Sequence, residues 1–324
     1  VDYSRAERFG DHLRVTFKGQ SPERILLLGH TDTVFPAGES AKRPFRITGS
    51  SATGPGVFDM KAGILLMWMA LRGLTHDKSP LANSVTVLLT SDEEVGSTSS
   101  RALLEAEAGM AKAVLVLEPS LPGGTLKTAR KGVGRFTIKA VGRAAHAGID
   151  PRKGINAIEE IAHQVLKLQS MGDNSGTTVT VGVIQGGTRS NVVPAEAAVE
   201  VDVRIASAEA AERISNGIHS LEPHLSGAKL EVRGAISRPP MVRTADTARL
   251  FSLAQSVGAE MGIDIQEGST GGASDGNFTS ALGIPTLDGL GAIGDGAHST
   301  DEFVDIPSLP FRAALIAGLI QRIR

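Results

Sequence analysis

The chain has 324 residues, with 33 Lys and Arg against 35 Asp and Glu, a formal net charge of −2 and no cysteine. A chain of this length can bury a substantial core and is comfortable for two domains. Balanced, interspersed charge argues against nucleic acid or an anionic membrane as partner, and the lack of cysteine excludes disulfides, thiolate nucleophiles and Cys-type zinc sites. We therefore expect a small-molecule or peptide substrate, and any metal must be held by His, Asp and Glu.

The ends and the apolar stretches of the chain say little about its location. The longest apolar stretch, 64–71, is far shorter than the ~20 residues that span a bilayer. The chain opens on VDYSRAERFG without Met, so we expect a segment to precede it. Because a cysteine-free chain suits cytosol and periplasm equally, we expect either compartment, with a slight preference for the cytoplasm.

The first part of the chain predicts alternating strands and helices. Residues 12–17 and 24–28 are β-type runs separated by KGQSPE, which we interpret as a hairpin. A buried helix is expected from about Asp59. Its apolar residues recur at helical spacing: Ile64, Met67, Trp68 and Leu71. Further elements are expected at 85–90 (strand), 100–108 (helix) and 113–117 (strand). The alternation predicts an α/β fold with a mixed, mainly parallel sheet.

From Gly134 the pattern changes to β-α-β-β-α-β, the order of a ferredoxin-like α+β unit. Its strands are expected at 135–141, 177–184, 197–205 and 229–235, and its helices at 155–168 and 207–221. After Pro239 and Pro240 the first pattern resumes with a helix at 247–261, a loop at 268–277, a strand near 284–287, a loop at 289–302 and a helix from Pro307. We therefore expect a discontinuous catalytic domain, residues 1–132 and 239–324, with residues 133–238 inserted.

Two adjacent carboxylates, Glu93 and Glu94, follow directly after the apolar run at 85–90. Ligands bind at the carboxyl ends of strands in open α/β sheets. Two neighbouring carboxylates repel each other, so such a pair calls for a bound cation or for different roles of the two residues. We therefore interpret one of the pair as a metal ligand and the other as a general base.

Other polar residues stand at predicted strand ends or in loops of the same domain: His30, Asp32, Asp59, Glu118 and His298. Two His and three carboxylates form a donor set that suits Zn²⁺ and can hold two ions that share one carboxylate. Each residue alone is more often a helix cap or a hydrogen-bonded polar residue. Capping gives no reason for all of them to fall on one edge of a sheet, so together they favour a metal site.

Phrases along nearly the whole chain carry a resemblance to a known family. They are, in order, GHTDTVFPAG, GPGVFDMKAG, TSDEEVGS, VLEPS, GRAAHAG, SNVVPAEA, VDVR, TGGASDGN and GAHSTDE. Together they resemble the co-catalytic zinc exopeptidases and amidohydrolases, which include bacterial glutamate carboxypeptidases, aminoacylases and succinyl-diaminopimelate desuccinylase. GHTDTVFP is most similar to the glutamate carboxypeptidase branch. The resemblance implies a zinc-exopeptidase-like catalytic domain with an inserted ferredoxin-like lid and dimerisation domain.

The resemblance also implies two Zn²⁺ per chain. It implies that Asp59 bridges them, that His30 and Glu94 complete one position, and that Glu118 and His298 complete the other. A cis peptide follows the bridging Asp in the family, so Asp59-Met60 is expected to be cis.

Two further residues receive catalytic roles from the resemblance. Asp32 would orient the imidazole of His30. Glu93 would take a proton from the attacking water and deliver it to the leaving amine.

The inserted domain contributes its own candidates. By resemblance, His146 and Asn191 would help to stabilise the tetrahedral oxyanion from the partner subunit, so we expect a homodimer through this domain. Arg204 and Arg238 are candidates for binding the free carboxylate of the substrate. For Arg204, a surface ion pair with Asp202 or Glu200 is an equal alternative.

Backbone N–H groups at Gly271 and Gly272, beside Asp275, are placed to cradle a carboxylate, and a solvated turn is the alternative. The remaining histidines have no companions in the sequence and are interpreted as structural: His12, His76, His163, His219 and His224.

We expect a zinc-dependent metallocarboxypeptidase that releases a C-terminal amino acid, glutamate by the resemblance, from peptidyl, N-acyl or folate-like substrates. An aminoacylase or desuccinylase-type amidohydrolase on the same site is the alternative. A zinc-free binding protein predicts the loss of a ligand, but every ligand position is occupied. A G-x-G-x-x-G match at 289–294 lacks the following helix and βαβ unit that a dinucleotide site requires.

Overall fold

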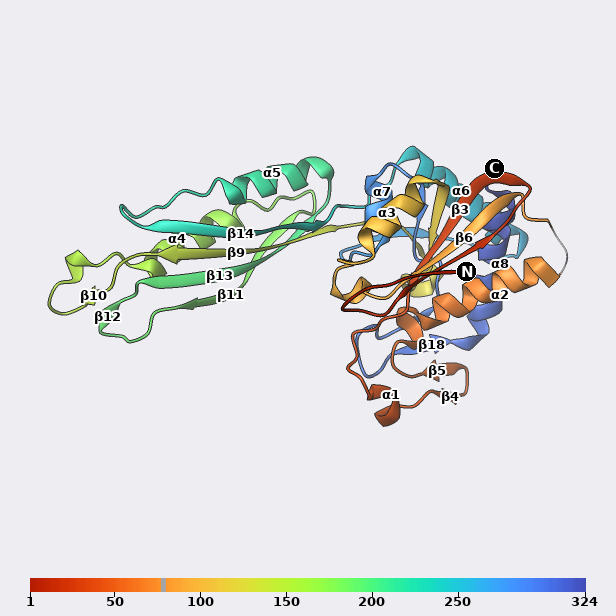
Figure 1. The fold of residues 1–324 in the computed structure, drawn as a ribbon, viewed down its shortest axis with the longest axis horizontal. Coiled ribbons are helices and arrows are strands. Elements are labelled where there is room, and N and C mark those ends of the chain that lie inside the picture. Colours follow the sequence, from red (N-terminus) through yellow and green to blue (C-terminus); the bar gives the residue numbers. More distant parts are fainter. Residues whose placement is uncertain (77–79) are drawn as a thin grey trace. The chain divides into compact units, whose positions relative to one another are not determined.

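The computed structural model describes residues 1–76 and 80–324, and these form two compact units (Figure 1). Unit 1 comprises Val1–Arg130, Met241–Thr270 and Ser274–Arg324, and unit 2 comprises Lys131–Pro240 and Gly271–Ala273. The expected catalytic domain was 1–132 and 239–324, and the expected insertion was 133–238. Residues 271–273, which we expected in the first domain, belong to unit 2.

Unit 1 is built on a six-stranded sheet with the order β1-β2-β6-β3-β7-β16. Its strands are β1 (Asp2–Ser4), β2 (His12–Phe17), β3 (Ser21–His30), β6 (Asn83–Thr90), β7 (Ala111–Val116) and β16 (Thr286–Leu287). Strands β6, β3, β7 and β16 run parallel to one another, whereas β2 is antiparallel to both β1 and β6. The predicted mixed, mainly parallel sheet is therefore confirmed.

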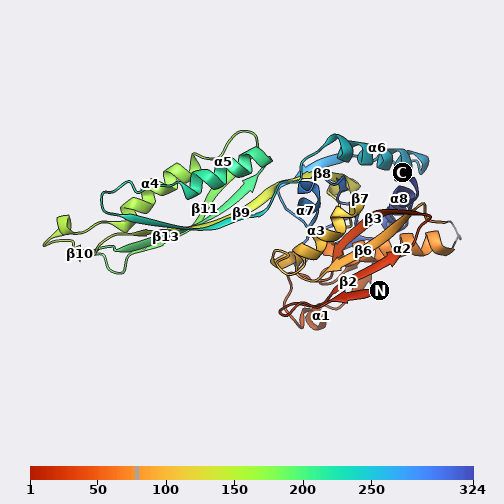
Figure 2. The same cartoon turned by 45° about the horizontal axis from the view of Figure 1, so that its top comes forward.

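The predicted hairpin between β2 and β3 is wrong. Both strands pair with β6, β2 antiparallel to it and β3 parallel to it, so β6 lies between them (Figure 2). The connection crosses the start of β6 at Gly19, where an added Cβ would lie 2.3 Å from the backbone of Asn83. Such a close approach of two backbones requires glycine. The local turn signal was correct, but strand pairing depends on a segment that is distant in the chain.

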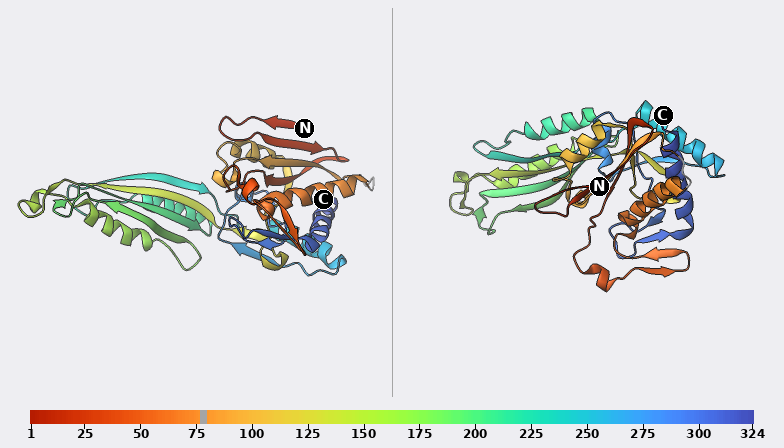
Figure 3. Two further views of the ribbon diagram at one scale, coloured as in Figure 1. Left: turned by 90° about the horizontal axis from the view of Figure 1, so that it is seen from below. Right: turned by 45° about the vertical axis from the view of Figure 1, so that its right-hand side comes forward.

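Helices cover both faces of this sheet. In β3, Ile25 and Leu27 face a core formed with α2 (Ala62–His76), α6 (Ala245–Glu260) and α8 (Leu309–Arg322). Leu26 and Leu28 face the other core, formed with α3 (Arg101–Gly109) and α7 (Gly276–Ala281). Helices α2 and α8 pack side by side on their face of the sheet (Figures 1 and 3). A strand buried on both faces is typical of parallel sheets and explains its continuous apolar run.

The buried face of α2 agrees in part with the expected one, since Met67 and Leu71 are buried and Trp68 is not. The buried side chains are Leu66, Met67, Ala70, Leu71 and Leu74. Trp68 is 52% exposed, and the guanidinium of Arg72 lies 4.9 Å from its ring centroid. The prediction that Trp68 is buried was wrong, because apolar residues surround this helix and spacing alone does not select the face. The α-helix begins at Ala62, after a turn over Val57–Lys61.

Unit 1 also contains short strands, between its loops, that we did not predict from the sequence. Strands β17 (Gly294–Asp295), β18 (Phe303–Asp305), β5 (Ser51–Thr53) and β4 (Arg46–Thr48) form one small sheet, and α1 (Glu39–Lys42) precedes β4. Strand β8 (Leu126–Arg130) pairs in parallel with β15 (Glu267–Thr270). The predicted loop at 268–277 therefore contains the end of β15 and the start of α7. Pairing of β18 with β5 brings the segment after β17 close to the turn that contains Asp59.

Unit 2 has the predicted element order β-α-β-β-α-β. Its main elements are β9 (Gly132–Val141), α4 (Ala157–Gln169), β11 (Thr178–Gly186), β13 (Glu196–Ile205), α5 (Ala208–His219) and β14 (Lys229–Arg238). The four strands form an antiparallel sheet with the order β11-β13-β9-β14. Both helices cover one face (Figure 2), where Val199, Val201 and Val203 of β13 are buried. Alternation of buried and exposed residues along β13 is expected for a sheet covered on one face.

No helix within residues 1–76 and 80–324 combines the length and the hydropathy needed to cross a lipid bilayer. The cellular compartment stays a prediction.

Candidate metal centre

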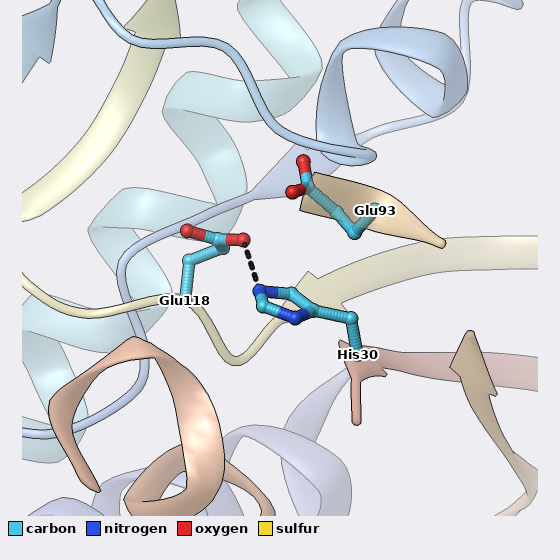
Figure 4. Close-up of side chains that lie close together, drawn as sticks. All are labelled: His30, Glu93 and Glu118. Atoms are coloured by element: carbon cyan, nitrogen blue, oxygen red, sulfur yellow. Dashed lines mark ion pairs between the residues drawn. The ribbon is translucent and has the colours of Figure 1, made fainter. Parts of the chain in front are cut away.

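The four parallel strands of unit 1 end at the same edge of the sheet. Across that edge, Glu93 and Glu94 follow β6, His30 ends β3, Glu118 follows β7 and Asp288 follows β16. One ligand atom from each of His30, Glu93 and Glu118 lies within 4.8 Å of the other two, and their side chains point toward one another (Figure 4). Parallel strand ends thus gather imidazole and carboxylate groups at one place.

Asp59 lies between two histidines. Its Oδ1 is 3.3 Å from Nε2 of His30, and its Oδ2 is 3.2 Å from Nε2 of His298. The same Nε2 of His298 is 3.2 Å from Oε2 of Glu94, and Oε1 of Glu118 is 3.4 Å from Nε2 of His30. Both oxygens of Asp59 are therefore directed at different imidazoles, with a second carboxylate beside each of them.

Glu302 holds the turn that carries Asp59. Its carboxylate accepts hydrogen bonds from the backbone N–H groups of Gly56 at 2.7 Å, Phe58 at 2.9 Å and Asp59 at 2.9 Å, and the residue is 1% exposed. The Asp59-Met60 peptide is cis, as expected. Glu302 was not identified from the sequence, because its three partners lie far earlier in the chain.

Asp32 connects His30 to the two adjacent glutamates. Its Oδ1 lies 3.5 Å from Nδ1 of His30, and its carboxylate accepts the backbone N–H groups of Glu93 at 3.3 Å and Glu94 at 2.9 Å. Burial opposes ionisation, but the hydrogen bonds with His30 and Glu94 lower the pKa of Asp32 below its usual value. Asp32 thus contacts both the imidazole of His30 and the segment that bears the two glutamates.

The second oxygen of Glu118 contacts a buried arginine. Oε2 of Glu118 is 3.3 Å from Nη2 of Arg130, whose guanidinium also binds both oxygens of Asp288 at 2.7 and 2.8 Å. Lys127, on the same strand as Arg130, is also buried, and burial, followed by the charge of Arg130, lowers its pKa. Arg130, Asp288 and Lys127 were not identified from the sequence.

Negative charge is crowded at this site. Burial, followed by the charge of Asp59, raises the pKa of Glu94 to about 7. The hydrogen bond with Asp59 is the main cause that raises the pKa of His298 to about 9. Burial would lower the pKa of His30, but its contacts with Asp32, Asp59 and Glu118 raise it well above the usual value. The groups thus retain protons that a bound cation would replace.

Buried atoms without hydrogen bonds indicate that these residues fit a metal. His30 Nε2, Asp59 Oδ1 and Glu94 Oε1 are fully buried and make no hydrogen bond of good geometry within the described part of the chain. Such atoms are costly unless something satisfies them, and here their lone pairs converge. Imidazole nitrogen and carboxylate oxygen are suitable donors for Zn²⁺ and similar divalent ions. Five residues therefore offer donors that fit divalent metal: His30, Asp59, Glu94, Glu118 and His298.

A polar network positions the segment that bears the two glutamates. Asp92 accepts the backbone N–H of Ser99 at 2.6 Å and its hydroxyl at 2.8 Å. The ring of His12 lies 3.1 Å from the Ser99 hydroxyl and 3.2 Å from that of Ser91. His12, 2% exposed, thus has partners that the sequence did not show, and they support a structural role.

Arg312 holds the loop that precedes His298. Its guanidinium is fully buried and donates to the carbonyl oxygens of Gly291 at 2.8 Å, Gly124 at 2.9 Å and Gly289. Burial lowers the pKa of Arg312 to about 10. Gly289 adopts a φ of 74°, the left-handed region that favours glycine.

Two candidates of unit 2 lie together. His146 ends β10 (Ala145–His146), which pairs with β12 (Val192–Val193). The backbone N–H of Ala147 donates to the carbonyl oxygen of Asn191 at 3.0 Å. Both candidate residues are exposed.

The other substrate candidates are engaged within the protein. Arg204 binds Asp202 at 2.8 and 3.2 Å and the carbonyl oxygen of Gly271 at 3.3 Å, which favours its surface-pair alternative. Arg238 ends β14 and is buried. Gly271 and Gly272 are exposed, whereas Asp275 is buried in unit 1 and accepts the Thr90 hydroxyl at 3.2 Å. Asp275 therefore supports the strand-end segment instead of the glycine turn.

The chain is similar to known proteins in sequence and in structure. The model of peptidase family M20/M25/M40 matches residues 26–322. Carboxypeptidase G2 of Pseudomonas sp. (strain RS-16) is 32% identical over 318 residues, which cover 96% of this chain and 76% of that protein. Succinyl-diaminopimelate desuccinylase of Thioalkalivibrio sulfidiphilus is 27% identical over 326 residues, covering 94% and 85%. Among solved structures, the aminopeptidase PepT of Bacillus cereus superimposes with a TM-score of 0.78 at 25% identity, covering 96% and 84%.

Proposed function

Since this chain belongs to peptidase family M20/M25/M40 and is a hydrolase of that family, we propose that it is a zinc-dependent carboxypeptidase that releases a C-terminal amino acid. Glutamate is the proposed product, because the resemblance to glutamate carboxypeptidases coincides with 32% identity to carboxypeptidase G2. Peptidyl, N-acyl and folate-like compounds are the proposed substrates. The observation that carries the proposal is the carboxylate of Asp59 between His30 and His298.

The proposed ligand sets follow the shortest contacts. One cation would be held by His30, Asp59 and Glu118, and the other by His298, Asp59 and Glu94. The family resemblance had implied the opposite pairing of histidines and glutamates. The contacts of 3.4 Å between His30 and Glu118 and of 3.2 Å between His298 and Glu94 favour the revised pairing. Because His30, Asp59 and Glu94 also have ligand atoms within 4.8 Å, all five groups surround one small volume.

Two bound divalent cations would polarise the scissile carbonyl and lower the pKa of a water molecule. Glu93 is in neither ligand set, yet its carboxylate lies beside His30 and Glu118. It takes a proton from the attacking water and delivers it to the leaving nitrogen, so one water is consumed and an acid and an amine are released. Asp32 holds the His30 ring in its orientation during this proton transfer.

Unit 2 is proposed as a ferredoxin-like lid and dimerisation domain. His146 and Asn191 would stabilise the oxyanion from the partner subunit. Arg238 and the backbone of Gly271 and Gly272 stay as proposals for the substrate carboxylate. Arg204 is the weaker candidate for binding the substrate carboxylate, because it already pairs with Asp202.

The alternative function uses the same centre. An aminoacylase or desuccinylase recognises a carboxylate on the other side of the amide, and the 27% identity to a desuccinylase keeps this class in consideration. Substrate preference decides between the two.

We expect a panel of N-acyl and peptidyl amino acids, varied only at the C-terminal residue, to show highest kcat/KM with glutamate. Replacing glutamate by glutamine should lower kcat/KM by about 10- to 100-fold, because one charge-assisted interaction worth roughly 1.5–3 kcal/mol is lost. The acyl group is held constant in that comparison. A second series with constant glutamate and varied acyl groups is the control. Strong selection for N-succinyl substrates, with little dependence on the C-terminal residue, would support the desuccinylase class instead.

We expect the protein to sediment as a homodimer. Strand β11 is at one edge of the unit 2 sheet, with Val183 41% and Ile184 58% exposed, and an exposed apolar edge favours pairing with another strand. Ile184→Lys should raise the dimer dissociation constant at least about tenfold, measured by sedimentation velocity over a concentration series, because a buried lysine is costly. Leu166→Lys, at a residue 69% exposed on α4 and outside β11, is the matched control. A monomeric wild type at all concentrations would refute the dimer.

A further inference from the structure

A buried ion pair stands directly behind Glu118. The guanidinium of Arg130 binds Asp288 through two parallel hydrogen bonds of 2.7 and 2.8 Å, and both side chains are 3% exposed or less. Asp288 also accepts the hydroxyl of Ser274 at 2.7 Å. The bidentate geometry leaves the guanidinium little freedom to rotate.

Glu118 is held at both of its oxygens. Oε2 lies 3.3 Å from Nη2 of Arg130, whereas Oε1 lies 3.4 Å from Nε2 of His30. The carboxylate therefore presents one oxygen to the proposed metal position, while the other is engaged by the arginine. Glu94, in the opposite set, has an Oε1 that is buried without a hydrogen bond.

We infer that Arg130, clamped by Asp288, is a positioning residue that makes Glu118 a one-oxygen donor for the cation at the His30 position. The inference rests on the proposed two-metal function. Partners that orient a metal ligand commonly change metal affinity by about 10- to 100-fold when removed. The ion pair is neutral as a unit, so its contribution is orientation and not net charge. Because Arg130 contacts Glu118, a member of one proposed ligand set, its effect belongs to that metal position.

The test uses the double variant Arg130→Met/Asp288→Asn. Removal of Arg130 alone would leave a buried carboxylate unpaired and could prevent folding. The double variant removes one charge of each sign, and the amide oxygen introduced by Asp288→Asn can still accept from the Ser274 hydroxyl. The net charge is thereby kept. The variant removes the clamp on Glu118, and Asp288→Asn also changes the carboxylate that accepts the backbone N–H of Gly289, so the melting temperature of each form is compared.

Metal-stripped protein is titrated with Zn²⁺ in a calorimeter, and thermal unfolding of the metal-free forms is recorded beside it. We expect wild type to bind two ions. The double variant should bind one ion with affinity within about threefold of wild type and the other about 10- to 100-fold more weakly. Adding Glu118→Gln to the double variant should weaken Zn²⁺ binding at the affected position by a smaller factor than Glu118→Gln does in wild type. The reason is that the two changes act on one interaction.

A matched control is Arg14→Met/Glu107→Gln, which removes one charge of each sign from another ion-pair cluster of unit 1, where the two residues are joined at 2.6 Å and also contact Asp2 and Arg24, without changing the five proposed ligands. It should leave both affinities unchanged. Two results would show that Arg130 is only a structural residue. In one, the double variant binds both ions as tightly as wild type. In the other, both affinities fall equally and the melting temperature is lower. If wild type takes up no metal, the proposed function itself fails, and this outcome is distinct from the other two.

Discussion

Glu93→Gln is expected to lower kcat by about 100- to 10,000-fold, the usual contribution of a general acid–base group. Glutamine has the same shape as glutamate but cannot take the proton of the attacking water. Glu93 is in neither proposed ligand set, so metal content should stay at two ions per chain. Its backbone N–H still donates to Asp32, so the segment should keep its position. Steady-state kinetics and metal analysis of the same preparation measure both results.

Glu94→Gln is the informative comparison for Glu93, because the two residues are adjacent and differ in proposed task. This variant should lose metal as well as activity, since Glu94 faces His298 at 3.2 Å. Activity close to wild type in Glu93→Gln would remove it as the base. Loss of metal from Glu93→Gln and retention by Glu94→Gln would reverse the two roles.

Asp59→Asn is expected to reduce the bound metal below two ions and to lower kcat/KM by about 1,000-fold or more. Its two oxygens face different histidines, so a neutral amide disturbs both proposed positions at once. Several kcal/mol of transition-state stabilisation depend on the metals, and about 4 kcal/mol corresponds to roughly 1,000-fold. Metal analysis after equilibration with excess Zn²⁺ checks the loss of binding, and kinetics check the loss of rate.

The control for Asp59 is Asp295→Asn in β17, an exposed carboxylate of unit 1 outside the proposed ligand set. It should retain two ions and near wild-type kinetics. Thermal unfolding identifies any variant whose loss comes from misfolding, because Glu302 depends on the backbone of Asp59 for one of its partners. Two tightly bound ions in a folded Asp59→Asn protein would show that Asp59 does not bridge them.

Several elements could be predicted because their signals are local. The β-α-β-β-α-β order of unit 2 follows from periodicity, and β13 shows the alternation that one buried face requires. The hairpin failed because a turn signal between β2 and β3 carries no information about β6, which enters between them. Trp68 was misplaced because α2 is apolar around most of its circumference, so only its neighbours decide which side is buried.

The donors at successive strand ends could be identified from the chain itself, because a strand and the polar residues that follow it are adjacent in sequence. His30, Glu93, Glu94 and Glu118 all carry this signal. Which carboxylate faces which histidine follows only from the folded arrangement. The same holds for Arg130 and Asp288 behind Glu118, since these two partners are 158 residues apart. Such contacts depend on the order of β6, β3, β7 and β16 in the sheet, and no local pattern encodes that order.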